Sequence, residues 1–176
     1  MMESPFKATY ILAGILLLYT LGGCSLNLPQ PTEAEDQTNT VDNEQLQPNP
    51  NLTPEDVIRI QVEALQNNDS EDTGIEITFR FASPSNKQFT GPLNRFKSMV
   101  KSPAYSPMLN HKLAEYGPLE ISEETATQRV TIIDPGGKAT VYLFSLSKQS
   151  DPACQGCWMT DSVVVVPVKQ QRLDGA

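Results

Sequence analysis

The segment 126–146, ATQRVTIIDPGGKATVYLFSL, decides the fold that this sequence predicts. Apolar and polar residues alternate over 126–133 and again over 139–146, as they do in strands that bury one face. Between the two runs stands DPGG at 134–137, which is a turn composition. The segment therefore predicts a β-hairpin within an antiparallel sheet.

The segments on either side of this hairpin predict an α+β fold. Residues 113–121 and 157–166 have strand patterns, and the second ends in a run of valines. Upstream, Thr53, Pro54 and two acidic residues predict the start of a helix that ends in the polar segment 67–70. A second helix is expected after 90–92. Helices followed by strands favour helices packed on one face of a sheet.

The local sequence pattern predicts the secondary structure of two short segments between these helices. The sequence SPSN at 83–86 predicts a turn. Apolar and polar residues alternate over 74–82, so the pattern by itself favours a strand there.

Residues 1–23 have the features of an export signal. A short start carrying Lys7 precedes an uncharged apolar run, and small residues precede Cys24. The sequence LGGC at 21–24 resembles a bacterial lipobox, in which Cys24 is acylated and becomes the first mature residue. We therefore expect a lipid-anchored, extracytoplasmic protein of the cell membrane or outer membrane. The alternatives are an ordinary secretory signal and an uncleaved anchor, although the run is shorter than the ~20 apolar residues that span a bilayer.

Composition divides the rest of the chain into three parts. Residues 24–52 are rich in Pro, Gln, Asn and acidic residues, which predicts a disordered tether. Residues 53–168 form the expected α+β domain, and residues 169–176 a flexible tail. The chain has a net charge of −8, and its domain has no basic patch in the sequence. Nucleic-acid binding is therefore not expected.

Several short motifs, taken in order, resemble an uncharacterised domain family of the nuclear-transport-factor-2-like superfamily, which occurs in bacteria and in some plant F-box proteins. These motifs are RFASP at 80–84, TGP at 90–92, YGPL at 116–119, QRV at 128–130 and GCWMTDSV at 156–163. The resemblance implies a cone-shaped fold, with N-terminal helices packed on a curved antiparallel sheet of about four strands around a cavity. It also implies that residues 74–82 are the second helix rather than a strand, and we adopt helix.

The candidate catalytic residues are Asp161, His111 and Tyr116. Cone-shaped enzymes similar to this fold place an Asp base and a Tyr donor in the cavity, so Asp161 is a candidate base if it faces inward. A solvent-facing strand acid and a loop histidine without a catalytic role are the simpler interpretations. Core packing likewise explains Trp158 and the tyrosines.

Cys154 and Cys157 remain as a pair once Cys24 is set aside. A structural disulfide is the favoured interpretation in an oxidising compartment, with free thiols and redox catalysis as alternatives. A single histidine is a poor supply of further ligands for zinc, so we expect no metal and no cofactor.

Two functions follow as hypotheses. The favoured one is a non-catalytic module that binds a small apolar ligand or a partner protein, with a homodimer formed through the sheet as one form. Apolar residues on both faces of 139–146 motivate it, because the second face needs a cover. The alternative is a small cofactor-free isomerase or dehydratase that uses Asp161. Fold alone does not choose between them.

Overall fold

The computed structural model describes residues 46–167 of the chain. The expected signal peptide, Cys24, most of the tether and the expected tail at 169–176 lie outside the described residues. The described part falls within a compact unit, Thr40–Ala176. Among residues 46–167, no helix is both long and apolar enough to cross a membrane.

Helix α1 (Pro54–Gln66) begins where the sequence predicts. The backbone N–H of Asp56 donates to the Thr53 hydroxyl, and the Thr53 N–H donates to the Asp56 carboxylate at 2.9 Å. This reciprocal capping box satisfies two backbone donors at the helix start, and Pro54 has none to satisfy. Helix α1 buries Val57 and Ile58 completely in the core.

Helix α2 (Thr73–Arg80) confirms the helix that the family resemblance implies for 74–82 and overrides the alternating pattern. The alternation is misleading because helix α2 contacts both α1 and α4, and Ile75 and Ile77 are both buried in this helix. Gly74 allows the close approach of α1, since a Cβ at this position would collide with the backbone carbonyl of Ala64.

The turn predicted at 83–86 is wrong: these residues begin helix α3 (Pro84–Thr90). The Ser83 hydroxyl accepts from the N–H of Asn86 at 3.2 Å, and Pro84 occupies the first helical position. Ser-Pro is a turn signal and equally a helix-start signal, so only the following residues separate the two. Helix α4 (Leu93–Val100) follows as predicted, and a short 3-10 turn covers Ser106–Met108.

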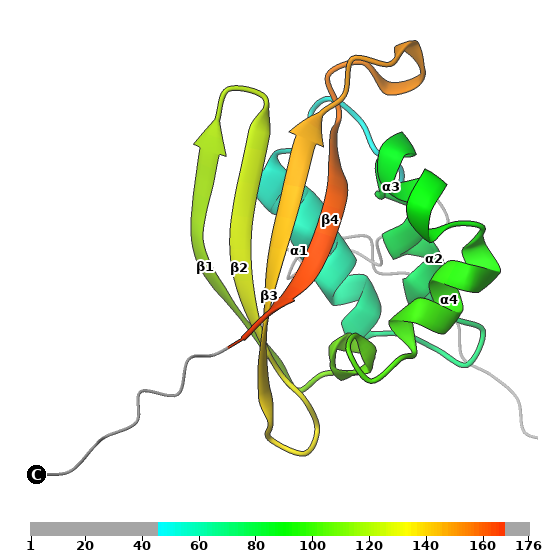
Figure 1. The fold of residues 1–176 in the computed structure, drawn as a ribbon, viewed down its shortest axis with the longest axis vertical. Coiled ribbons are helices and arrows are strands. Elements are labelled where there is room, and N and C mark those ends of the chain that lie inside the picture. Colours follow the sequence, from blue (N-terminus) through cyan, green and yellow to red (C-terminus); the bar gives the residue numbers. More distant parts are fainter. Residues whose placement is uncertain (1–45, 168–176) are drawn as a thin grey trace, which may run out of the picture. The chain divides into compact units, whose positions relative to one another are not determined.

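The sheet has four antiparallel strands in chain order, β1 (Leu113–Ser122), β2 (Thr125–Ile133), β3 (Ala139–Lys148) and β4 (Trp158–Val166). The β2–β3 hairpin is confirmed, with Val130 opposite Tyr142. Figure 1 shows the sheet curling, with α1 behind it and α2–α4 gathered beside the β4 edge. The chain is therefore an α+β domain with its helices on one side of a bent sheet.

The core lies between the inner face of the sheet and the helices. Its fully buried members come from β2, β3, α1 and α2, among them Val130, Tyr142, Phe144, Ile58 and Ile75. Burial of each such side chain contributes about 1.5–3 kcal/mol. Because every described core residue lies within residues 40–176, that unit is expected to fold without residues 1–39.

Residues 46–52, which the sequence assigns to the tether, are packed on the domain. Leu46 and Leu52 contact the core cluster. This polar segment packs on the domain because burial of these two bulky apolar side chains is favourable. The disulfide expected between Cys154 and Cys157 is present in the structure, with 5.5 Å between its Cα atoms. Its loop meets the packed segment, since the Cys154 Sγ lies 3.3 Å from the carbonyl oxygen of Pro48.

Candidate functional site

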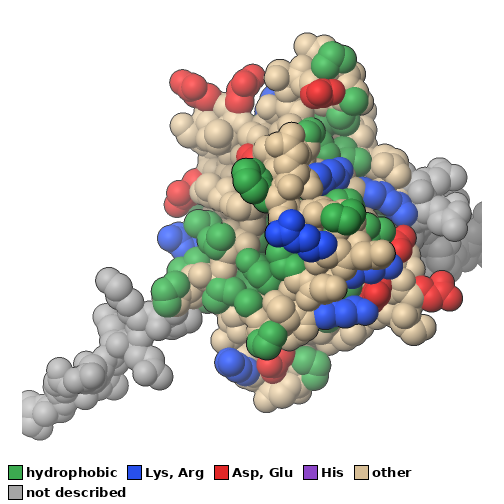
Figure 2. All heavy atoms as spheres, turned by 45° about the vertical axis from the view of Figure 1, so that its right-hand side comes forward, with side chains coloured by type: hydrophobic (Ala, Val, Ile, Leu, Met, Phe, Trp, Pro, Cys, Tyr) green, Lys and Arg blue, Asp and Glu red, His purple; other side chains and the backbone are tan. Residues whose placement is uncertain are grey.

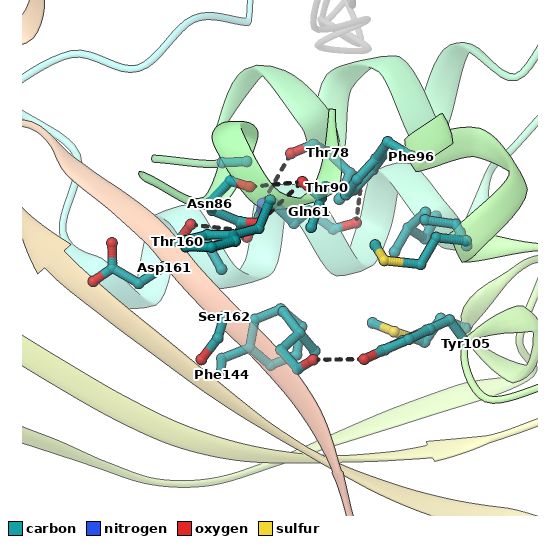
Figure 3. A pocket seen from close by; sticks show the side chains of 17 residues that line it. Gln61, Thr78, Asn86, Thr90, Phe96, Tyr105, Phe144, Thr160, Asp161 and Ser162 are labelled. Carbon is teal, nitrogen blue, oxygen red and sulfur yellow. Dashed lines mark hydrogen bonds between the residues drawn. The ribbon is translucent and has the colours of Figure 1, made fainter. Parts of the chain in front are cut away.

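A largely apolar cavity of about 300 Å³ lies between β4, α1 and the α2–α4 helices (Figure 3). This volume is at the lower end of the range of small-molecule sites. Its apolar wall is formed mainly by Leu65, Phe96, Met99, Val100, Met108 and Phe144. These residues come from two helices, α1 and α4, a 3-10 turn and the sheet, so the cavity exists only in the folded domain.

A bulge in β4 sets the side of the cavity nearest the sheet. The β3–β4 register advances from Ser145 opposite Ser162 to Leu146 opposite Thr160, which leaves Asp161 without a partner on β3. Thr160 is also bonded on its other side, because its N–H donates to Phe81 O at 2.9 Å. The bulge thus turns Thr160 inward and Asp161 aside.

The deeper polar end of the cavity centres on Gln61. Its side-chain oxygen accepts from the Thr160 hydroxyl at 2.6 Å, and its amide nitrogen donates to the carbonyl of Thr78 at 3.0 Å. Gln61 and Thr160 are only 2 % and 1 % exposed. Because buried polar groups are costly when unpaired, these bonds fix α1, α2 and β4 relative to one another.

Helix α3 adds a second, shallower polar pair. The Asn86 amide donates to the carbonyl of Thr160 at 3.0 Å, and the Thr90 hydroxyl donates to the carbonyl of Asn86 at 2.9 Å. Asn86 and Thr90 lie one helical turn apart, so they share the face that borders the cavity. Figure 3 shows this pair beside Gln61 and Thr160, across from Phe144 and Tyr105.

The aromatic wall is held in place by hydrogen bonds to backbone. The Tyr105 hydroxyl donates to Val163 O at 3.0 Å, and the Tyr142 hydroxyl behind it donates to Ala104 O at 2.9 Å. Burial, and secondarily the neighbouring Tyr105, raise the pKa of Tyr142 to about 12. Tyr142 is therefore neutral at physiological pH, and the two hydrogen bonds fix the orientation of both rings.

One side chain at the rim stands out by its exposure. Phe89, on α3, lines the cavity and yet is 75 % exposed. Figure 2 shows further hydrophobic side chains gathered toward the end of β4, where Val164 and Val165 are 45 % and 41 % exposed. An exposed aromatic ring beside an apolar cavity is a surface that a ligand can cover.

The three candidate catalytic residues are not brought together. Asp161 borders the cavity, but its carboxylate points away from Phe96 and Tyr105 in Figure 3, and the described residues offer it no hydrogen bond or ion pair. His111 is buried behind the cavity wall, with its Nδ1 2.9 Å from Met108 O. In the described part of the chain, the candidate residues therefore form no acid–base pair that faces the cavity.

Tyr116 lies on β1, away from the β4 edge. Its ring stacks under the guanidinium of Arg59, 4.8 Å from the ring centroid, and burial raises the pKa of its hydroxyl. Trp158 packs against the core, as expected. Among the described residues, no group of three or more potential ligands is placed to hold a metal ion.

Apart from Asp161, the sequence does not predict the hydrogen-bonding residues of the cavity, which are Gln61, Thr78, Asn86, Thr90 and Thr160. One signal was available: Gln61 interrupts the apolar face of α1, between Ile58 and Leu65. A polar residue at a buried helical position must be hydrogen-bonded to a partner elsewhere in the fold. Asn86 carries no such signal because it falls within the turn predicted at 83–86, and Phe89 and Thr90 follow that turn before the next expected helix.

Comparison with known proteins identifies a family and no closer relative. The family model described as "Domain of unknown function (DUF4864)" matches residues 48–173. No curated protein and no solved structure matches the chain significantly. The match spans most of the chain and nearly all of the described domain, in keeping with the resemblance to an uncharacterised domain family. The chain therefore belongs to the DUF4864 family of domains of unknown function.

Proposed function

We propose that this protein is an exported, lipid-anchored binding module whose domain takes a small apolar molecule into the cavity beside β4. The observation that carries the proposal is the apolar cavity of about 300 Å³, with fixed aromatic walls and a small polar end. Such a combination is the usual form of a small-molecule site. In fold terms we propose a cone-shaped, nuclear-transport-factor-2-like domain, which would place the ligand between the helices and the curved sheet.

The geometry favours binding over catalysis. A cofactor-free isomerase needs a base within about 3 Å of the substrate proton and a donor for the developing charge. The polar side chains of the cavity are instead committed within the protein. Gln61 bonds the Thr160 hydroxyl and the Thr78 carbonyl. The Thr78 hydroxyl donates to Gly74 O. Asp161, the base of the catalytic alternative, is turned aside by the bulge, so we do not carry that alternative forward.

Cys24 supplies the proposed location. Acylation of Cys24, for instance with palmitate, would tether the domain to a membrane outside the cytoplasm, where the Cys154–Cys157 disulfide is stable. Because residues 46–52 pack on the domain, the proposed tether would end before residue 46.

Ligand binding can be tested with the neutral, environment-sensitive dye N-phenyl-1-naphthylamine on residues 40–176. We expect its fluorescence to rise on binding and Phe89→Ser to weaken that binding several-fold without a loss of stability. Ile121→Ser is the matched control, because Ile121 is also exposed, at 55 %, but lies on β1. If the dye binds wild type and Phe89→Ser equally, it does not bind in the cavity. If the dye does not bind at all, the proposed binding function is refuted.

Lipidation can be tested separately in cells that make the full chain. Wild-type protein should incorporate labelled palmitate and fractionate with membranes. Cys24→Ser should abolish the label, whereas the double variant Cys154→Ser/Cys157→Ser should keep it. Labelling that persists in Cys24→Ser would refute the assignment.

A homodimer through the outer face of the sheet remains a proposal for the partner. Leu143 lies opposite Val164 on that face, and Val164 and Leu113 are 45 % and 47 % exposed. Sedimentation equilibrium of residues 40–176 should report a dimer that Val164→Glu dissociates. A monomer at all concentrations would remove this part of the proposal and leave ligand binding intact.

A further inference from the structure

We infer that the cavity selects an uncharged, mainly hydrocarbon molecule that carries one hydroxyl group, and that this hydroxyl binds beside Asn86 and Thr90. The inference rests on the proposed binding function and adds to it the charge and the polar group of the ligand. It follows from comparing the hydrogen-bond donors and acceptors of the cavity that are already paired within the protein with those that remain for a ligand.

The first step concerns charge. No lysine or arginine is among the described residues that line the cavity, and its one carboxylate, Asp161, points away from the aromatic wall. A carboxylate or ammonium group placed in the cavity would therefore lose its hydration without gaining an opposite charge. Burial of an unpaired ion is strongly unfavourable, so the cavity should reject both anions and cations.

The second step concerns the hydroxyl protons of the cavity. Thr160 gives its proton to Gln61 Oε1 at 2.6 Å, and Thr78 gives its proton to Gly74 O at 2.9 Å. Thr90 gives its proton to Asn86 O at 2.9 Å. With their protons committed, these three hydroxyl groups can only accept from a ligand.

The third step concerns the amide of Asn86. One of its two N–H groups donates to Thr160 O at 3.0 Å, and the second is left over in the described structure. A ligand hydroxyl can donate to the Thr90 oxygen and accept from this second N–H. A ketone or ester oxygen can only accept, so a hydroxyl matches the pair better than either.

The position of the pair selects it over the deeper polar residues. Asn86 and Thr90 are half-buried on α3, whereas Gln61 and Thr160 are almost fully enclosed by their mutual bonds. Phe89 lies next to Thr90 and is exposed, so its ring can cover the hydrocarbon near the hydroxyl. The hydroxyl would thus bind at the α3 side of the cavity, with the hydrocarbon against Phe96, Met99 and Phe144.

The test uses four molecules of one shape: naphthalene, 2-naphthalenemethanol, 2-naphthoate and 2-naphthylmethylammonium at pH 7. Binding is read from the ε-methyl NMR signals of ¹³C-labelled methionine, because Met99 and Met108 line the cavity and Met159 does not. Affinities are measured on residues 40–176. The full chain in detergent is titrated in parallel, to check that the same two signals shift.

We expect 2-naphthalenemethanol to bind about 2- to 10-fold more tightly than naphthalene, which is the gain from one net hydrogen bond. Both ions should bind at least 10-fold more weakly than the alcohol. The signals of Met99 and Met108 should shift while that of Met159 stays in place.

A pair of threonine variants tests the hydroxyl position. Thr90→Val keeps the shape of the side chain and removes its oxygen, so it should abolish the preference for the alcohol while naphthalene binds as before. Thr127→Val is the control, because Thr127 lies on the outer side of β2 and should change neither affinity. Asn86→Ala provides a second variant if Thr90→Val unfolds.

The outcomes separate the inference from the proposed function. If an ion binds within 2-fold of the alcohol, or if the alcohol keeps its advantage in Thr90→Val, the inference is overturned and the binding module stands. If none of the four molecules and no neutral dye shifts Met99 or Met108, the proposed function falls as well.

Discussion

The bond between Thr160 and Gln61 should be a measurable source of stability at the cavity. The two side chains meet at 2.6 Å, and each is at most 2 % exposed. Thr160→Val keeps the shape of residue 160 and leaves the Gln61 oxygen buried without a donor. Leaving one buried polar group unsatisfied costs about 1–3 kcal/mol, so we expect the free energy of unfolding to fall by that amount.

Gln61→Met should cost more, because it leaves two groups unpaired. The Thr160 hydroxyl loses its acceptor, and the Thr78 carbonyl loses the Gln61 amide that donates at 3.0 Å. We expect a loss of about 2–5 kcal/mol on the same scale. In the double variant only the Thr78 carbonyl is left unpaired, so its loss should be smaller than the sum of the single losses by about 2 kcal/mol.

Equilibrium urea denaturation of residues 40–176, followed by the fluorescence of Trp158, measures each loss. Thr127→Val, at a half-buried position on the outer side of β2, is the control and should change stability by less than about 0.5 kcal/mol. If the losses of the two single variants add to within about 0.5 kcal/mol, the two side chains are not coupled and the assigned polar end of the cavity is wrong.

Three further predictions concern the elements around the cavity. Cys154→Ser/Cys157→Ser should lower stability by about 2 kcal/mol, the chain-entropy value for so short a loop; equal urea midpoints for the oxidised protein and this variant would contradict it. Gly74→Ala should cost about 1–3 kcal/mol, since the new Cβ collides with the Ala64 carbonyl; thermal unfolding measures this, and an unchanged midpoint would mean that α1 and α2 can separate freely. The hydrogen bonds from the Thr53 hydroxyl and N–H hold the pKa of Asp56 below its ordinary 3.8. The ionised Asp56 carboxylate therefore stabilises the folded domain above pH 3.8, and this stabilisation is lost as the pH falls through the pKa of the folded state. Asp56→Asn should remove this acid-dependent part of the stability, which a pH titration of the urea midpoint measures.

The hairpin could be predicted because everything that specifies it is local. Alternation over 126–133 and 139–146 fixes which residues face inward, and DPGG at 134–137 fixes the turn. The start of α1 is local in the same sense, since Thr53 and Asp56 are three residues apart. The alternating pattern of 74–82 is misleading because the segment contacts both α1 and α4. A helix in this position can bury both isoleucines.

The cavity could not be predicted in this way, because its polar end joins distant parts of the chain. Gln61 and Thr160 are 99 positions apart, and Asn86 reaches Thr160 across 74. No spacing rule connects such positions from a single sequence. The bulge that turns Thr160 inward is equally invisible in the pattern of β4, where the predicted base Asp161 occupies what looks like an ordinary strand position.

The size of the cavity is itself an argument that something fills it. Protein interiors are close-packed, and an unfilled apolar volume costs about 24 cal/mol per Å³. For about 300 Å³ this gives an upper bound of ~7 kcal/mol, reduced here because the mouth at Phe89 opens to solvent. Gln61, Thr78 and Thr160 commit their polar groups to hydrogen bonds at one end of this space, and under the proposed function a bound ligand recovers the lost contacts.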